Sequence, residues 1–125
     1  MSGTRPSVMV IDDDHDVCEV YAEVLRDAGY DVISAHDGNR AFELLQHSVP
    51  RPGVILVDLM MPFMDGGTFL RQQSADPRLS QVPVVVMSAG RRPADLHGVA
   101  YLQKPVSLEE LLRTVATYIK PREDA

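Results

Sequence analysis

The chain has 125 residues, 45% of them hydrophobic and 24% charged, which fits one globular domain that buries its own core. Its formal net charge of −6 argues against direct binding to nucleic acid or to an anionic membrane surface, because both need a basic face. The single cysteine, Cys18, excludes an internal disulfide, no apolar run is long enough to span a membrane, and residues 1–6 lack a signal-peptide core, so we expect a cytoplasmic protein.

The first predicted elements are a strand and a helix. Residues 8–11 are wholly apolar, as in a strand buried on both faces. Asp13 or Asp14 is placed to cap the helix that follows, and Gly29 ends its pattern. The apolar residues of this helix recur at intervals of three and four: Val17, Val20, Tyr21, Val24, Leu25 and Ala28.

The middle of the chain repeats this alternation. Residues 31–35 are predicted as the second strand and residues 39–47 as the second helix. Residues 54–57 form another apolar run that ends at Asp58, and a third helix is expected over residues 68–74. The pattern therefore predicts a strand that delivers a carboxylate at its end.

Two more strands and a helix are expected in the last third. Residues 84–87 form a strand that ends at Ser88, and residues 99–103 form a short fifth strand that ends at Lys104. Ser107 is placed to cap a last amphipathic helix. Alternating strands and helices predict right-handed βαβ units, and so a doubly wound α/β fold with a five-stranded parallel sheet.

Chemically active side chains follow four of the five predicted strands. Sites in such sheets form beyond the carboxyl ends of the strands, and a strand order of 2-1-3-4-5 would make these four strands contiguous. Three converging carboxylates would repel one another, and a hard cation such as Mg²⁺ relieves that repulsion. A lysine and a hydroxyl beside such a site suit phosphoryl transfer, with a carboxylate as nucleophile. The residues concerned are Asp12, Asp13, Asp58, Ser88 and Lys104.

Each of these residues also has an ordinary structural interpretation. An aspartate after an apolar run is commonly a helix cap, a Lys-Pro pair is commonly a surface turn, and a lone serine carries no signal. Their coincidence at one end of one sheet favours a functional site.

Five motifs resemble those of two-component response-regulator receiver domains, over about residues 7–119. The resemblance implies a flavodoxin-like fold with strand order 2-1-3-4-5, and a single receiver domain over residues 1–125. The motifs are Val10-Ile11-Asp12-Asp13-Asp14, Val57-Asp58-Leu59-Met60-Met61-Pro62, Met64-Asp65-Gly66, Met87-Ser88-Ala89 and Gln103-Lys104-Pro105.

The resemblance also implies a function. Asp58 would accept a phosphoryl group from a sensor histidine kinase or a phosphotransfer protein. Asp12, Asp13, Asp58 and the backbone carbonyl of Met60 would hold Mg²⁺. Such a protein is not a conventional enzyme, since it catalyses the phosphorylation and dephosphorylation of its own aspartate, and its output is altered binding to a protein partner.

Three further residues take roles from the same resemblance. Ser88 corresponds to the hydroxyl that moves toward the phosphoryl group, Lys104 to the lysine that pairs with that group, and Tyr101 to the switch aromatic. The peptide bond between Lys104 and Pro105 is expected to be cis.

The interval from Ser88 to Lys104 is shorter than is usual in this family. Residues 93–97 leave room for about one turn, so we expect a shortened fourth helix between the fourth and fifth strands. The neighbouring Arg91 and Arg92 are interpreted as a solvated loop pair, or, less simply, as groups that reach the phosphoryl group or an acidic partner.

Two alternatives to a phosphoryl switch stay open on the sequence. The shortened helix is compatible with a receiver-like scaffold or binding module that does not switch. An enzyme on a similar fold is the other alternative. The acidic loop after the first strand would repel a flavin phosphate, and Met60 stands where an aspartyl phosphatase would need a second acid.

Overall fold

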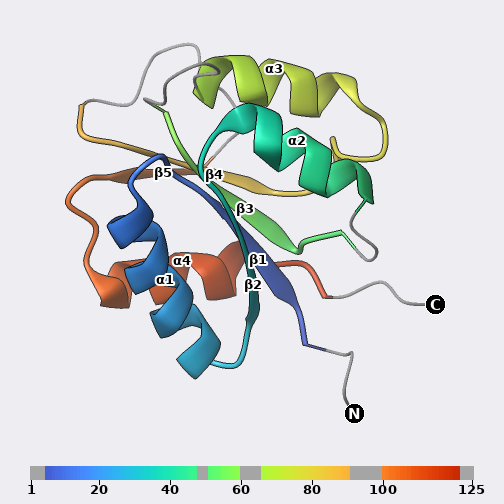
Figure 1. Ribbon diagram of the computed structural model, residues 1–125. Helices are drawn as coiled ribbons and strands as arrows, with labels where there is room; N and C mark the ends of the chain where they lie inside the picture. The colour runs from blue at the N-terminus through green and yellow to red at the C-terminus, as the bar shows by residue number, and fades with distance from the viewer. Residues whose placement is uncertain (1–4, 48–50, 60–65, 91–99, 122–125) are drawn as a thin grey trace.

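A computed structural model describes residues 5–47, 51–59, 66–90 and 100–121. Strands and helices alternate through most of these residues, as the sequence predicts (Figure 1). The elements are β1 (Ser7–Ile11), α1 (His15–Asp27), β2 (Asp31–Ala35), α2 (Gly38–His47), β3 (Val54–Asp58), α3 (Gly66–Ala75), β4 (Val84–Ser88), β5 (Ala100–Gln103) and α4 (Leu108–Tyr118).

All five strands are parallel and lie in the order β2-β1-β3-β4-β5, which confirms the predicted topology. The helices α2 and α3 cover one face of the sheet, and α1 and α4 cover the other (Figure 1). The strand order reverses between β1 and β3, so the carboxyl ends of these two strands form the switch point at which sites of this fold develop.

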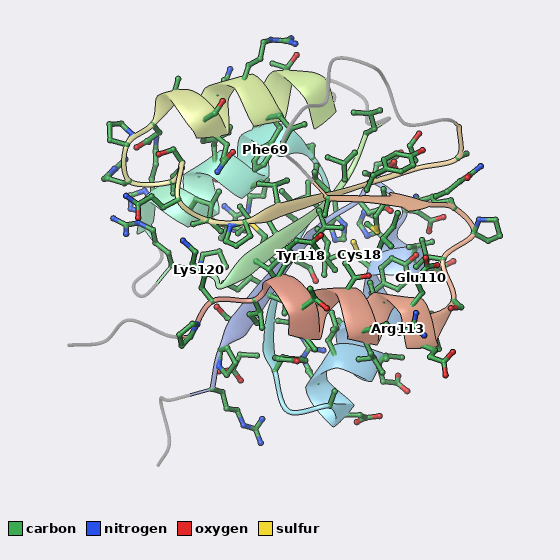
Figure 2. The ribbon with its side chains drawn as sticks, turned by 180° about the vertical axis from the view of Figure 1, so that it is seen from behind. Cys18, Phe69, Glu110, Arg113, Tyr118 and Lys120 are labelled. Atoms are coloured by element: carbon green, nitrogen blue, oxygen red, sulfur yellow. The ribbon has the colours of Figure 1, made fainter. Side chains whose placement is uncertain are left out.

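The central strands β1, β3 and β4 are apolar except at Ser7, Asp58 and Ser88, because both faces of the sheet are covered. Successive side chains point to opposite faces, so each strand contributes to two separate cores. Met9, for example, packs in the core that contains Phe69 of α3, whereas Val10 packs in the core that contains Cys18 of α1. Phe69 and Cys18, on opposite faces of the sheet, are labelled in Figure 2. The strands β3 and β4 are buried along their whole length.

Helix α1 has the predicted ends but a different buried face. Asp14 is its N-cap and accepts hydrogen bonds from the backbone of the first turn, and Gly29 follows its end with a φ of 104°. The prediction that Val20 belongs to the buried stripe is wrong, because 51% of Val20 is exposed. Cys18 and Ala22 are buried instead, since small side chains on that face let the helix lie close to the sheet.

The label α4 denotes the last helix, which Ser107 caps as predicted by accepting a hydrogen bond from the backbone N–H of Glu110 at 3.0 Å. The expected shortened fourth helix, around residues 93–97, lies outside the described residues, as do Arg91 and Arg92. Of the helices in the described ranges, none has both the length and the apolar character that a bilayer span requires.

The segment after α4 returns to the start of β3 and pairs with Gly53 there. The backbone N–H of Lys120 donates to the Gly53 carbonyl at 3.0 Å, and the N–H of Gly53 donates to the Ser7 carbonyl at 2.8 Å. A Cβ atom on residue 53 would lie 2.5 Å from the Lys120 carbonyl oxygen and 2.7 Å from Cγ1 of Ile119. Glycine is therefore required here for a close approach of two backbones. Figure 2 shows Lys120 beyond the end of α4.

Gly53→Ala should lower the free energy of unfolding by about 2 kcal/mol, because the added methyl group overpacks a contact made by backbone. Urea denaturation followed by circular dichroism measures this difference. Gly90→Ala is the matched control, since a Cβ atom at residue 90 meets nothing within 4 Å. Equal stability of the two variants would contradict the proposed role of Gly53.

Candidate metal centre

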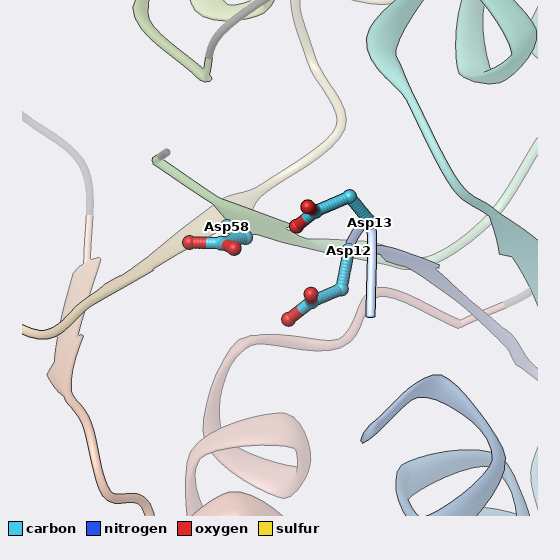
Figure 3. A group of neighbouring side chains, drawn as sticks. All are labelled: Asp12, Asp13 and Asp58. Atoms are coloured by element: carbon cyan, nitrogen blue, oxygen red, sulfur yellow. The ribbon is translucent and has the colours of Figure 1, made fainter. Parts of the chain in front are cut away.

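Three carboxylates converge at the switch point of the sheet. Asp12 directly follows β1, Asp13 is next to it, and Asp58 is the last residue of β3. One carboxylate oxygen from each lies within 4.8 Å of the other two. Asp12 and Asp58 are only 1% and 7% exposed, whereas Asp13 is exposed. Figure 3 shows the side chains of Asp12 and Asp13 extending from the end of β1 toward Asp58.

Lys104, which follows β5, reaches the same cluster. Its Nζ donates to Oδ2 of Asp12 at 3.0 Å and lies 3.5 Å from Oδ2 of Asp58. Partial burial of the ammonium group would by itself lower the pKa of Lys104. The hydrogen bond and charge of Asp12, together with the charge of Asp58, outweigh burial and raise that pKa above its ordinary value. Lys104 is therefore a fixed positive charge at neutral pH.

The residues present fit a hard divalent cation. Three carboxylates against one ammonium leave an excess of negative charge in a partly buried cluster. All of these ligand atoms are oxygen, the donor type that Mg²⁺ takes, and the cluster includes no thiolate or imidazole ligand that would favour zinc. The donor set of the acidic cluster thus fits Mg²⁺.

Ser88 and Tyr101 are joined to each other through Gly90. Ser88 is 6% exposed at the end of β4, and its Oγ accepts a hydrogen bond from the Gly90 N–H at 3.3 Å. The Tyr101 hydroxyl donates to the Gly90 carbonyl, and it lies 3.5 Å from the Ser88 carbonyl oxygen. The Lys104 N–H also donates to the Ser88 carbonyl, at 2.7 Å.

The structure thus brings Asp12, Asp13, Asp58 and Lys104 into one cluster. Ser88 and Tyr101 form a second, adjoining group at the ends of β4 and β5. Met60, whose carbonyl is the remaining predicted metal ligand, lies outside the described residues. The peptide bond between Lys104 and Pro105 is cis, as expected.

Sequence reasoning missed two residues that hold the Asp12 backbone. The Asp12 carbonyl accepts a hydrogen bond from Sγ of Cys18 at 3.3 Å and lies 3.2 Å from Nδ1 of His36. Burial raises the pKa of the Cys18 thiol to about 12, with the charge of Asp12 adding to the effect, so the thiol keeps its proton and can donate. His36 directly follows β2, and that position at the site edge of the sheet is the signal that could have revealed it.

Comparison with known proteins agrees with this architecture. Residues 8–116 match the family described as response regulator receiver domain. The chain is 36% identical over 127 residues to the response regulator MprA of Mycobacterium avium, with 94% of this chain and 54% of that protein covered. The chain therefore spans about half the length of the curated relatives it matches.

Solved structures of response regulators and receiver domains are also similar to this chain. The chemotaxis response regulator CheY4 of Vibrio cholerae superposes with a TM-score of 0.84 at 28% sequence identity, with 93% of this chain and all of that chain covered. A CheY-like receiver domain protein from Methanospirillum hungatei gives a TM-score of 0.79 at 34% identity, covering 91% of this chain and 94% of the other. With its parallel sheet and the acidic cluster at the switch point, the chain belongs to the response regulator receiver domain family.

Proposed function

We propose that the chain is a phosphoryl-accepting signalling switch and that Asp58 is the acceptor. The observation that supports this most strongly is the setting of the Asp58 carboxylate at the end of β3. It is nearly buried, within 4.8 Å of the oxygens of Asp12 and Asp13, and 3.5 Å from the ammonium of Lys104. A carboxylate in such a setting can accept a phosphoryl group, because Lys104 and a cation held by the three carboxylates would neutralise the negative charge of that group.

Asp12, Asp13 and Asp58, with the carbonyl of Met60, would hold Mg²⁺. When bound, this ion neutralises charge on the phosphoryl oxygens and helps to align donor and acceptor. The fit of the three carboxylates to a hard cation supports this assignment.

The residues of the chain have distinct tasks in the transfer. An Asp58 carboxylate oxygen attacks phosphorus and forms the new O–P bond. The P–N bond to the phosphohistidine of the donor breaks, and its electron pair stays on the imidazole nitrogen, which takes up a proton. Lys104 already contacts Asp58, so its charge is in place to pair with an oxygen of the arriving phosphoryl group.

The contacts of Ser88 suggest how the change is relayed. In our proposal the Ser88 hydroxyl turns toward the phosphoryl group and gives up the hydrogen bond that its Oγ accepts from Gly90. The Gly90 carbonyl is also the acceptor of the Tyr101 hydroxyl, so a shift of Gly90 releases or reorients Tyr101. Tyr101 is half-buried and can therefore present the change at the surface.

The partners follow from the family. Receiver domains interact with histidine kinases, so the proposed donor is a sensor histidine kinase or a phosphotransfer protein. The proposed output is altered binding to a protein target. The unit proposed to carry out these steps is a single receiver domain with its core over about residues 7–119.

Labelling with acetyl phosphate tests the proposal without knowledge of the kinase. The chain should gain one phosphoryl group in Mg²⁺ and none in excess EDTA, as read by intact-protein mass spectrometry. A receiver-like scaffold that does not switch predicts no labelling under either condition. Absence of labelling in Mg²⁺, by acetyl phosphate and by a panel of phosphorylated kinases, would contradict the proposed function.

A further inference from the structure

His36 lies beside the metal ligand Asp12 because of the register of the sheet. Ile11 pairs with Ala35, and the Asp12 N–H donates to the Ala35 carbonyl at 3.1 Å. His36, the next residue, places its Nδ1 3.2 Å from the Asp12 carbonyl oxygen. A carbonyl oxygen has no proton to give, so Nδ1 must carry the proton and act as the donor. The contact therefore fixes the tautomer of His36.

The Asp12 carbonyl is held from two sides. Cys18 donates to it from α1, and His36 donates from the segment between β2 and α2. A carbonyl oxygen has two lone pairs, so it can accept both hydrogen bonds. A thiol is a weak donor, so the imidazole N–H is the stronger of the two. Because the backbone of Asp12 is fixed, its carboxylate starts from a defined position.

His15 holds the ring of His36 in place. The two rings stack with their centroids 3.7 Å apart and their planes 11° from parallel. His15 is the first residue of α1, so the stack links the start of that helix to the end of β2. Lone pairs of imidazole nitrogens lie in the ring plane, and those of two parallel rings do not converge on one ion. The stack therefore suits bracing and is a poor arrangement for a second metal site.

We propose that His36, braced by His15, is a positioning residue that holds the Asp12 backbone through its Nδ1–H and thereby increases the affinity of the acidic cluster for Mg²⁺. This inference rests on the proposed function, because it assigns a task toward the ion that the function requires. Partners that orient metal ligands commonly change metal affinity by tenfold or more.

Titration of the folded chain with Mg²⁺, followed by calorimetry, tests the role of His36. His36→Ala should bind Mg²⁺ about tenfold more weakly than the wild type. His36→Asn should bind within about twofold of the wild type, because the asparagine amide N–H takes the place of Nδ1–H. His36→Gln should be as weak as His36→Ala, since its amide lies where Nε2 was. His47→Ala, which removes an exposed histidine at the end of α2, is the control and should be unchanged.

A double-mutant cycle tests the role of the stack. His15→Ala should weaken Mg²⁺ binding by about twofold when His36 is present and have no effect when His36 is alanine. Equal effects in both backgrounds would overturn the bracing role of His15.

The results separate this inference from the proposed function. If the wild type does not bind Mg²⁺, the proposed function fails and the inference fails with it. If the wild type binds and His36→Ala binds equally well, the inference alone is overturned. If His36→Asn is no better than His36→Gln, the N–H donor role is overturned. If circular dichroism finds His36→Ala unfolded, the comparison of His36→Asn with His36→Gln still tests the N–H donor role.

Discussion

Asp58→Asn should reduce Mg²⁺-dependent labelling by acetyl phosphate to below about 1% of the wild-type level, because an amide oxygen is a far poorer nucleophile than a carboxylate. Intact-protein mass spectrometry measures the labelled fraction. The matched control is Asp37→Asn. Asp37 accepts a hydrogen bond from the Arg40 N–H at 2.7 Å at the start of α2, and asparagine caps helices about as well as aspartate.

The expected loss of labelling in Asp58→Asn should not result from unfolding. Asp58→Asn removes one of the three clustered carboxylates, which lowers their mutual repulsion, and the ion pair between Lys104 and Asp12 stays in place. The free energy of unfolding in EDTA should therefore not fall. Undiminished labelling of Asp58→Asn would show that another residue accepts the phosphoryl group and would refute the assignment.

Lys104→Met should lower the free energy of unfolding in EDTA by about 2 kcal/mol. Removing one partner of a buried ion pair leaves an uncompensated charge and costs about 3–5 kcal/mol when both partners are fully buried. Asp12 is buried, but the Lys104 side chain is 25% exposed, which reduces the expected loss. Urea denaturation of wild type and variant in EDTA measures the difference.

Lys120→Met is the natural control, because Lys104 and Lys120 are the two lysines of the chain and Lys120 is exposed. It should change stability by less than about 0.5 kcal/mol. Added Mg²⁺ should restore part of the stability of Lys104→Met, since the ion replaces the missing positive charge. Equal stability of the two variants in EDTA would contradict the proposed role of the Lys104 contacts.

The raised pKa of Lys104 sets the pH range of this effect. A group whose pKa is higher in the folded state contributes its full stability below its unfolded pKa, which for lysine is about 10.4. The contribution is lost as the pH rises through the higher folded value. The stability difference between wild type and Lys104→Met should therefore be constant from neutral pH to about pH 10 and shrink above it.

The strands and their order were predictable because burial on both faces leaves a clear trace in sequence. The apolar runs at residues 8–11, 54–57 and 84–87 coincide closely with β1, β3 and β4. Parallel strands also place their carboxyl ends at one edge of the sheet, so the residues that follow them can be grouped from the sequence. The convergence of Asp12, Asp13, Asp58 and Lys104 confirms that grouping.

The orientation of α1 was not predictable from its branched apolar residues. Val20 lies about 200° around the helix from Cys18, so the two cannot share a face. The sheet selects Cys18, Tyr21, Ala22 and Leu25, and leaves Val20 in solvent. Hydrophobicity alone underestimates the burial of Cys18 and Ala22, because their small size permits close packing.

The hydrogen bonds that the Asp12 carbonyl accepts could not be predicted from the sequence either. They depend on a histidine 24 positions away and on a cysteine six positions away, and each of these residues contacts a backbone atom. Periodicity places side chains on faces, but it does not specify hydrogen bonds to a carbonyl. The stack of His15 on His36 is a tertiary contact of the same kind.

The most direct test of the account is to locate the phosphoryl group on the chain. Labelling with acetyl phosphate in Mg²⁺, reduction with borohydride and peptide mass spectrometry would convert an aspartyl phosphate to homoserine and identify its position. Homoserine is expected at residue 58 and at no other position. Modification at Asp12 or Asp13 instead, or a phosphoryl group that resists borohydride on a serine or histidine, would contradict it.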